Sequence, residues 1–167
     1  MSVNFTGIIA AICMMTASYV QAQDTAEGQV TGLPVPRFVS MKSGSANVRR
    51  GPSTSNRVDW VLRHRGTPLK VMAEYQDWFR VEDVDGEGGW VHTDLLSTLR
   101  TVLVQEDLLA LRETPSTSAR ALARLEAGVT PRLSQCHLEW CEVSIDGFDG
   151  WLPKNSIWGV LENEIRE

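Results

Sequence analysis

Cysteine and histidine are the side chains of this sequence whose spacing could support covalent or metal chemistry. Two of the three cysteines, Cys136 and Cys141, bracket a four-residue segment in "QCHLEWCEV". A catalytic thiolate needs a base and an orienting group, and the three histidines of the chain stand in no recognisable arrangement of that kind. One histidine beside Cys-x4-Cys also falls short of a zinc ligand set. The spacing favours a disulfide across a hairpin turn over free thiols, and the sequence predicts no metal site and no cofactor.

A disulfide requires export to an oxidising compartment, and the N-terminus supplies a signal for it. The segment "IIAAICMMTASYV" is shorter than the roughly 20 apolar residues that span a bilayer. Val20-Gln21-Ala22 has the small or modest residues that a signal peptidase accepts. We therefore expect residues 1–22 to be a signal peptide cleaved after Ala22. The mature chain would be periplasmic or secreted, without stable membrane insertion; an uncleaved anchor remains the alternative.

Trp60, Tyr75 and Arg50 are the side chains that could bind a ligand without covalent chemistry. Trp60 and Tyr75 flank the turn "RHRGTPLKV" beside a basic cluster, and neither has an aromatic counterpart in the second half of the chain. Arg50 is replaced there by Glu113. A residue that differs between two related halves is a better binding candidate than one that recurs. We predict these three as ligand-binding residues, with burial between the two halves as the alternative for the aromatic rings.

The two halves of the chain are copies of one unit. "ANVRRGPSTS" (46–55) matches "LALRETPSTS" (109–118), "QDWFRV" (76–81) matches "LEWCEV" (138–143), and "DGEGGWV" (85–91) matches "DGFDGWL" (146–152). The offset falls from 63 to 62 to 61, as expected when loops lose single residues and the framework stays. A repeat at fixed spacing indicates an internal duplication. The tryptophans that recur are interpreted as packing residues, and Arg49 and Arg112 as braces of their own loops.

Each unit is expected to be a small β-barrel. "WFRVED" and "WCEVSI" alternate apolar and polar residues, the period of a half-buried strand, and "DGEGG" and "DGFDG" are hairpin turns. "SARALARLEAG" would also allow a helix, but its alignment with "NRVDWVLRHRG" favours a strand. Short strands of this kind can curl into a closed barrel, which removes exposed edges. The predicted fillings are Val48, Val58, Val61, Leu69, Val71, Val81, Val91 and Leu95 in the first unit, and Leu111, Leu122, Leu125, Leu133, Val143, Ile145, Leu152 and Ile157 in the second.

The composition sets the domain boundaries and excludes one class of partner. Residues 23–36 are expected to be a linker, residues 37–99 and 100–161 the two barrels, and residues 162–167 an acidic tail. The net charge is −5 and the pI about 5.2, which give no general attraction to nucleic acid. A basic block between Arg37 and Arg65 leaves nucleic-acid binding as a weaker hypothesis. The sequence makes no prediction of the oligomeric state.

The pattern Asn-Val-Arg-x-Gly-Pro-Ser-Thr, Trp-Phe-x-Val, Gly-x-x-Gly-Trp-Val and Leu-Leu-Ser, which runs from Asn47 to Ser97, resembles the bacterial SH3 (SH3b) family. The second unit departs from it, with Ala110 for the asparagine and Thr114 for the glycine, and resembles a degenerate copy. The resemblance implies an all-β fold of two tandem SH3-like barrels. It also implies a non-catalytic module that binds cell-wall (peptidoglycan) peptides or an envelope protein. The alternatives are an accessory or regulatory subunit of a cell-wall hydrolase, or a hydrolase itself.

Overall fold

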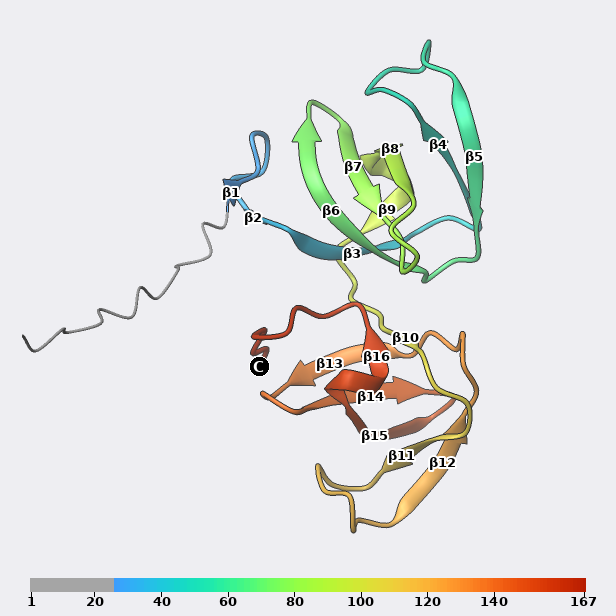
Figure 1. The fold of residues 1–167 in the computed structure, drawn as a ribbon, viewed down its shortest axis with the longest axis vertical. Coiled ribbons are helices and arrows are strands. Elements are labelled where there is room, and N and C mark those ends of the chain that lie inside the picture. Colours follow the sequence, from blue (N-terminus) through green and yellow to red (C-terminus); the bar gives the residue numbers. More distant parts are fainter. Residues whose placement is uncertain (1–25) are drawn as a thin grey trace, which may run out of the picture.

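The structure is a computed structural model that describes residues 26–167. The predicted signal peptide, with its cleavage after Ala22, lies outside the described residues. The described part is built from β-strands and two short 3-10 helices, which confirms the all-β prediction. Two barrel-like units lie one above the other, and the chain passes once between them (Figure 1). Within residues 26–167, no helix has the length and apolar character needed to cross a membrane.

The first barrel is a curved, antiparallel sheet of seven strands. Their order of pairing is β5 (Val58–Arg63), β4 (Ser45–Arg49), β8 (Gly88–His92), β7 (Trp78–Glu82), β6 (Pro68–Tyr75), β3 (Arg37–Met41) and β9 (Leu96–Ser97). The 3-10 helix η1 (Thr93–Leu95) joins β8 to β9. Meander hairpins connect the neighbours in the centre of the sheet, and β3 and β9 close one side.

The second barrel repeats this order, except that its first and last strands form a separate pair. Its five-stranded sheet contains β12 (Ala121–Leu125), β11 (Leu109–Arg112), β15 (Phe148–Pro153), β14 (Trp140–Ile145) and β13 (Arg132–Cys136). The helix η2 (Lys154–Ser156) corresponds to η1. A separate pair, β10 (Leu103–Val104) with β16 (Ile157–Trp158), stands where β3 pairs with β9 in the first barrel. Residues 121–125 form a strand, so the alignment between the units predicted this element correctly.

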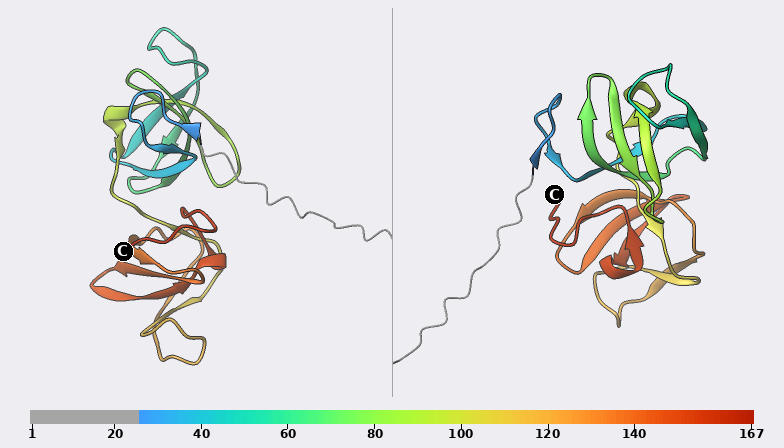
Figure 2. Two further views of the ribbon diagram at one scale, coloured as in Figure 1. Left: turned by 90° about the vertical axis from the view of Figure 1, so that its left-hand side faces the viewer. Right: turned by 45° about the horizontal axis from the view of Figure 1, so that its top comes forward.

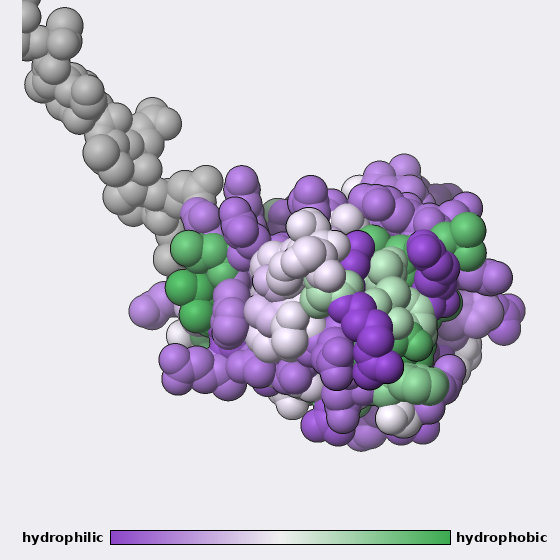
Figure 3. Space-filling view, turned by 90° about the horizontal axis from the view of Figure 1, so that it is seen from below, coloured by the Kyte–Doolittle hydropathy of each residue, from purple (hydrophilic) through white to green (hydrophobic). Residues whose placement is uncertain are grey.

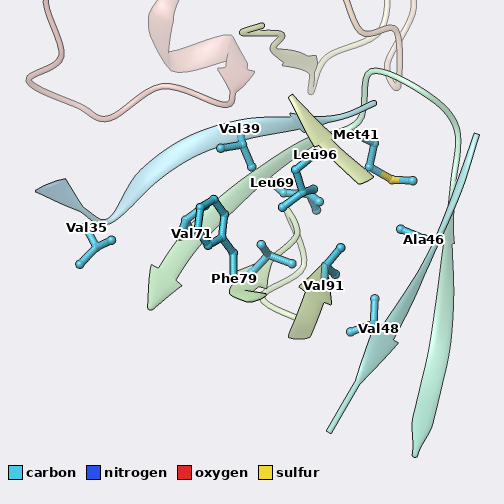
Figure 4. Close-up of a cluster of buried hydrophobic side chains, with 11 residues drawn as sticks. Val35, Val39, Met41, Ala46, Val48, Leu69, Val71, Phe79, Val91 and Leu96 are labelled. Carbon is cyan, nitrogen blue, oxygen red and sulfur yellow. The ribbon is translucent and has the colours of Figure 1, made fainter. Parts of the chain in front are cut away.

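Each barrel has its own hydrophobic core. Figure 4 shows the first core, with side chains from β3, β4, β6, β7, β8 and β9 pointing toward a common centre. Thirteen of the sixteen predicted filling residues are either buried or packed against these clusters. The exceptions are Val58, which is half-buried, Val61, which is 39% exposed, and Leu122, which is also half-buried.

The errors at Val61 and Leu122 have one cause. Side chains alternate between the two faces of a strand, so residues three positions apart point in opposite directions. Leu62 packs against the first core with Trp60, and Val61 between them faces out. In β12, Leu125 is buried and Ala123 packs on the same core, so Leu122 belongs to the other face. Hydrophobicity alone does not distinguish the two faces of a strand, so it predicts some outward-facing residues as core residues.

The glycine before Trp90 and the glycine before Trp151 are required by close packing between crossing strands. A Cβ added at Gly89 would lie 2.6 Å from Val48 Cγ1 and 2.8 Å from the Arg49 carbonyl oxygen. The same atom added at Gly150 would lie 2.8 Å from Leu111 Cγ and from the Arg112 carbonyl oxygen. Real Cβ atoms do not approach this closely, so the repeat keeps glycine at both crossings.

The interpretation of residues 23–36 as a linker is wrong for the part that the structure describes. β1 (Ala26–Glu27) and β2 (Pro34–Val35) form a hairpin, seen beside the first barrel in Figure 1. Val35 is 8% exposed and belongs to the first core. The turn of the hairpin is held by Glu74 of β6, whose carboxylate accepts hydrogen bonds from the backbone N–H groups of Val30 (2.9 Å) and Thr31 (2.8 Å).

The C-terminal segment is also more than an acidic tail. Glu164 accepts two hydrogen bonds from the Arg100 guanidinium, at 2.8 and 3.2 Å. Arg166 exchanges backbone hydrogen bonds with Cys136, at 2.8 and 3.0 Å. We call residues 161–167 the C-terminal strap, because they run back across the second barrel and pair with the edge of β13. The two views of Figure 2 show the C-terminus against the second barrel, on the side where the β1–β2 hairpin flanks the first.

Contacts around Arg100 join the two barrels. Its guanidinium also donates to the Gly159 carbonyl (2.7 Å) and lies over the ring of Phe38 at 5.6 Å. Phe38 of the first barrel meets Trp158 of the second edge-to-face, with ring centroids 5.0 Å apart. The Thr101 hydroxyl donates to the Gly66 carbonyl at 2.6 Å. Polar and aromatic contacts of this kind link the core-bearing units across the short connection.

Candidate functional site

The predicted ligand-binding residues Arg50, Trp60 and Tyr75 all lie in the first barrel. Arg50 follows β4 and its guanidinium contacts the Asp59 carboxylate at 3.3 Å, which Arg57 contacts at 2.5 Å. Arg57 and Arg50 lower the pKa of Asp59, although burial opposes this. Trp60 is half-buried and packs against the first core. Tyr75 is 48% exposed at the end of β6.

The structure brings two of these residues near each other and leaves the third apart. Asp59, the partner of Arg50, immediately precedes Trp60 on β5. Tyr75 lies at the far end of the eight-residue β6, away from the β5–β6 turn. In the sheet order, β4, β8 and β7 separate β5 from β6. Ligand binding by these three residues remains a prediction. They do not form one groove, because Tyr75 lies apart from Arg50 and Trp60.

A groove of about 890 Å³ lies on the second barrel instead. It is formed by the β13–β14 turn, η2, the start of β16, and the loops around residues 106 and 117. Its lining residues are Glu106, Thr117, Leu138, Glu139, Trp140, Pro153, Lys154, Asn155, Ser156, Ile157, Val160 and Glu162. These five parts and the C-terminal segment that contains Glu162 therefore meet here.

A second hollow of about 570 Å³ is also lined by the β13–β14 turn. It shares Leu138, Glu139 and Trp140 with the first and adds three apolar or aromatic contacts from Pro115, His137 and Ile165. We call the two hollows together the Trp140 groove. Figure 3 views the molecule from the end occupied by the second barrel, where hydrophobic surface appears in separate areas bordered by hydrophilic surface.

The disulfide fixes the turn that divides this groove. Cys136 and Cys141 are bonded, with their Cα atoms 4.1 Å apart and directly opposed on β13 and β14, which confirms the predicted pairing. Inside the loop, the His137 N–H donates to the Trp140 carbonyl at 2.8 Å. The Lys154 N–H donates to the Glu139 carbonyl at 2.8 Å and so ties η2 to the turn. The disulfide and these two hydrogen bonds hold the turn that carries the exposed Leu138.

The wall opposite the turn is the C-terminal strap, and Lys154 holds it. The Lys154 Nζ donates to the carbonyl oxygens of Glu162 (3.1 Å) and Glu164 (2.6 Å). Burial lowers the pKa of Lys154, and the nearby Glu164 carboxylate counteracts this. Burial by itself would raise the pKa of Glu164, but hydrogen bonds from Arg100 and the Leu161 N–H lower it. These paired charges keep the strap in place beside the groove.

The remaining charges of the groove are three carboxylates. Glu106 and Glu139 are exposed, as is Glu162 on the strap. Among residues 26–167, none of the three makes an ion pair within 4.0 Å. The rim of the groove is therefore acidic, and its floor includes aromatic and aliphatic side chains such as Trp140 and Ile157.

The lining offers groups for binding and no assembled nucleophile and base. The buried hydroxyl of Ser156 faces the amide oxygen of its neighbour Asn155 at 3.4 Å. His137 packs its ring against Trp151, with centroids 4.9 Å apart. Across the part of the chain that the structure describes, no three histidine, cysteine or acidic side chains gather closely enough to hold a metal ion. The described geometry can enclose a ligand and contact its charge.

The sequence missed this site because Trp140 recurs as Trp78. In the first barrel Trp78 is 8% exposed and meets His92 edge-to-face at 5.1 Å. In the second, Pro153 pairs with Trp140 at the position of His92. The tryptophan that recurs is thus a packing residue in one copy and half-exposed in the other. The substitution of the aromatic partner, together with the apolar Leu138 in a turn, was the available signal.

Two tandem β-barrels, each a curved meander closed by a 3-10 helix and a short last strand, define a module of SH3 type. The family model described as "Bacterial SH3 domain" matches residues 42–98 and 105–159, which together exceed half of the chain. The protein belongs to the bacterial SH3 domain family, with two tandem domains. The resemblance read from the sequence is confirmed, including the second, more divergent copy.

Comparison with solved structures finds low-identity similarities. NlpC2 from Trichomonas vaginalis is 11% identical with a TM-score of 0.33, over 74% of this chain and 48% of that one. NlpC1 from the same organism is 9% identical with a TM-score of 0.35, over 78% and 48%. An NlpC/P60 family protein from Bacillus cereus is 15% identical with a TM-score of 0.33, over 72% and 55%. The chain spans about half the length of these proteins, and no curated protein matches it.

Proposed function

We propose that this protein is an exported, non-catalytic binding module that recognises cell-wall (peptidoglycan) peptides or an envelope protein through the Trp140 groove. The observation that carries the proposal is that the two hollows share the β13–β14 turn, which a disulfide closes. A concave site with apolar lining and a few polar groups is the usual form of a binding site. Export is supported by the disulfide, since such bonds persist in oxidising compartments.

The chemical composition of the groove suits an extended peptide. Leu138 is 66% exposed and Ile165 is 63% exposed, and both line the second hollow with the half-buried Trp140. Exposed large apolar side chains gathered around one aromatic ring often mark an interaction site. Backbone and side-chain polar groups of Asn155 and Thr117 lie along the same groove and could accept or donate hydrogen bonds to a peptide backbone.

Co-sedimentation with isolated peptidoglycan sacculi tests the proposal. The chain from residue 23 onward should be retained, and Trp140→Ala should lose most of this retention, since truncating a central aromatic anchor costs ~2 kcal/mol or more of binding. Tyr75→Ala is the matched aromatic variant in the first barrel, and it tests the position predicted from the sequence. Retention unchanged by Trp140→Ala but lost in Tyr75→Ala would move the site to the first barrel.

A protein partner is tested on the same variants. Immobilised protein with and without Trp140→Ala is exposed to an envelope extract, and a protein retained only by the unmodified chain identifies the envelope-protein form of the proposal. Circular dichroism confirms that each variant is folded. If neither sacculi nor any envelope protein is retained by the unmodified chain, the proposed function is wrong.

A further inference from the structure

We infer that the Trp140 groove selects a peptide segment that carries a primary ammonium group next to an apolar side chain. This inference rests on the proposed function and names the chemistry of its ligand. It begins from the three carboxylates of the rim, Glu106, Glu139 and Glu162, which come from three separate elements of the second barrel. Three elements therefore each place a negative charge at the rim of the same partly apolar groove.

The groove has one ammonium of its own, and that group is already engaged. Lys154 is 8% exposed, and its Nζ donates to the carbonyl oxygens of Glu162 and Glu164. The Glu164 carboxylate beside it is in turn bound by Arg100. The ammonium therefore stabilises the strap and leaves the outer carboxylates without a cation within 4.0 Å in the described part of the chain.

The floor between these carboxylates suits the rest of such a ligand. Trp140 is half-buried, so part of its ring faces the groove, and an aromatic face attracts a cation within about 6 Å of its centre. Leu138 and Ile165 supply further apolar surface in the second hollow. An ammonium at the end of a flexible carbon chain can reach the rim while its carbon chain covers the indole.

The first barrel lacks this combination at the corresponding positions. Ser43 stands where the second barrel has Glu106, and Gln76 where it has Leu138. Its tryptophan at this place, Trp78, is buried against His92. Only the acidic residue of the turn recurs, as Asp77. Selection for an ammonium is therefore a property expected of the second barrel and not of the shared fold.

The test uses two synthetic peptides of sequence acetyl-Gly-Leu-Lys-Gly-amide, one with a free lysine amine and one with that amine acetylated. Acetylation removes the charge and leaves the chain almost unchanged in length. Binding is measured by titration calorimetry and by tryptophan fluorescence at low and at physiological salt. Exposed ion pairs have small individual energies, so the free-amine peptide should bind about three- to ten-fold more tightly, and the ratio should fall as salt is raised.

Two charge-matched variants place the effect in the groove. Glu139→Gln should reduce the preference for the free amine by about three-fold, since it removes one rim charge. Glu126→Gln removes the same charge from an exposed loop that does not line the groove and should leave the preference unchanged. Equal loss in both variants would indicate a general effect of net charge and would overturn the inference.

The outcomes separate this inference from the proposed function. Equal affinity for the two peptides overturns ammonium selection while the groove remains a binding site. Retention on sacculi without binding of either peptide also overturns it, because the ligand is then recognised by other chemistry. Failure of peptides, sacculi and envelope proteins together would refute the proposed function on which the inference rests.

Discussion

Protonation of Glu74 should release the N-terminal hairpin from the first barrel. The Glu74 side chain is fully buried, and burial by itself would raise its pKa. The Thr31 hydroxyl and N–H, the Val30 N–H and the Arg37 guanidinium all donate to the carboxylate and together lower its pKa to about 2. The hairpin is thus held by a carboxylate that stays ionised well below the usual range.

The size of the effect follows from the shift. A fall from 4.5 to about 2 corresponds to about 3 kcal/mol of preference for the ionised folded state, at 1.36 kcal/mol per pKa unit. Because the folded pKa is the lower one, this stability is fully present above pH 4.5 and is lost as pH falls toward 2. Glu74→Gln imitates the protonated state, so it should increase opening of the hairpin at neutral pH by about a hundred-fold.

Amide NMR measures both quantities. The N–H signals of Val30 and Thr31 should titrate with a midpoint near 2, and hydrogen-exchange protection across the hairpin should fall in Glu74→Gln at pH 7. Glu27→Gln, an exposed charge in β1 of the same hairpin, is the control and should leave that protection unchanged. A midpoint near 4.5 would refute the reasoning, as would full protection in Glu74→Gln.

Three further predictions concern stability. Replacing Cys136 and Cys141 together by serine should lower the free energy of unfolding of the second barrel by about 2 kcal/mol, because the loop that the disulfide closes becomes free in the unfolded state. Urea denaturation measures this change, and an unchanged midpoint would contradict it. Gly150→Ala should cost about 1–3 kcal/mol, since its methyl group would overlap Leu111, and a thermal midpoint equal to that of the parent would count against the strand crossing described. Val71→Ala should cost about 2 kcal/mol and Val61→Ala less than about 0.5 kcal/mol by the same assay, because only the first is buried; equal losses would mean that the parity of β5 is misassigned.

The sequence carried the framework because the framework is local and repeated. Hairpin turns depend on glycine within a few residues, and strands on the alternation of adjacent side chains, so both are readable without tertiary information. The disulfide was predictable for the same reason, since Cys136 and Cys141 are only five positions apart. Because the unit is duplicated, each element can be compared with its counterpart in the other unit. This comparison favours a strand over a helix for residues 121–125, and the structure has a strand there.

The site could not be read in this way, because it depends on contacts between distant residues. Glu74 binds a hairpin that begins 48 positions earlier in the sequence, and a segment rich in glycine and proline gives no sign of such a partner. Trp140 lines the groove together with residues of η2 and of the strap, which are distant from β14 in the sequence. Aromatic residues without a counterpart in the other unit do not mark the groove, whereas the replacement of the aromatic partner His92 by Pro153 does.

The two barrels show how one framework position can acquire two uses. Glu74 and Cys136 occupy the corresponding place near the end of β6 and β13, each two residues before a hairpin tip. In the first barrel a carboxylate there binds an N-terminal segment; in the second, the backbone of a disulfide cysteine pairs with a C-terminal segment. The C-terminal segment covers the outer edge of β13, which would otherwise leave unpaired N–H and C=O groups exposed. The N-terminal segment is held by a buried carboxylate and should respond to acid. The C-terminal segment, which charged hydrogen bonds also hold, pairs with a cysteine of the disulfide and should respond to reduction as well. The strap also forms one wall of the Trp140 groove. The same segment therefore covers the edge of β13 and contributes to the proposed binding surface.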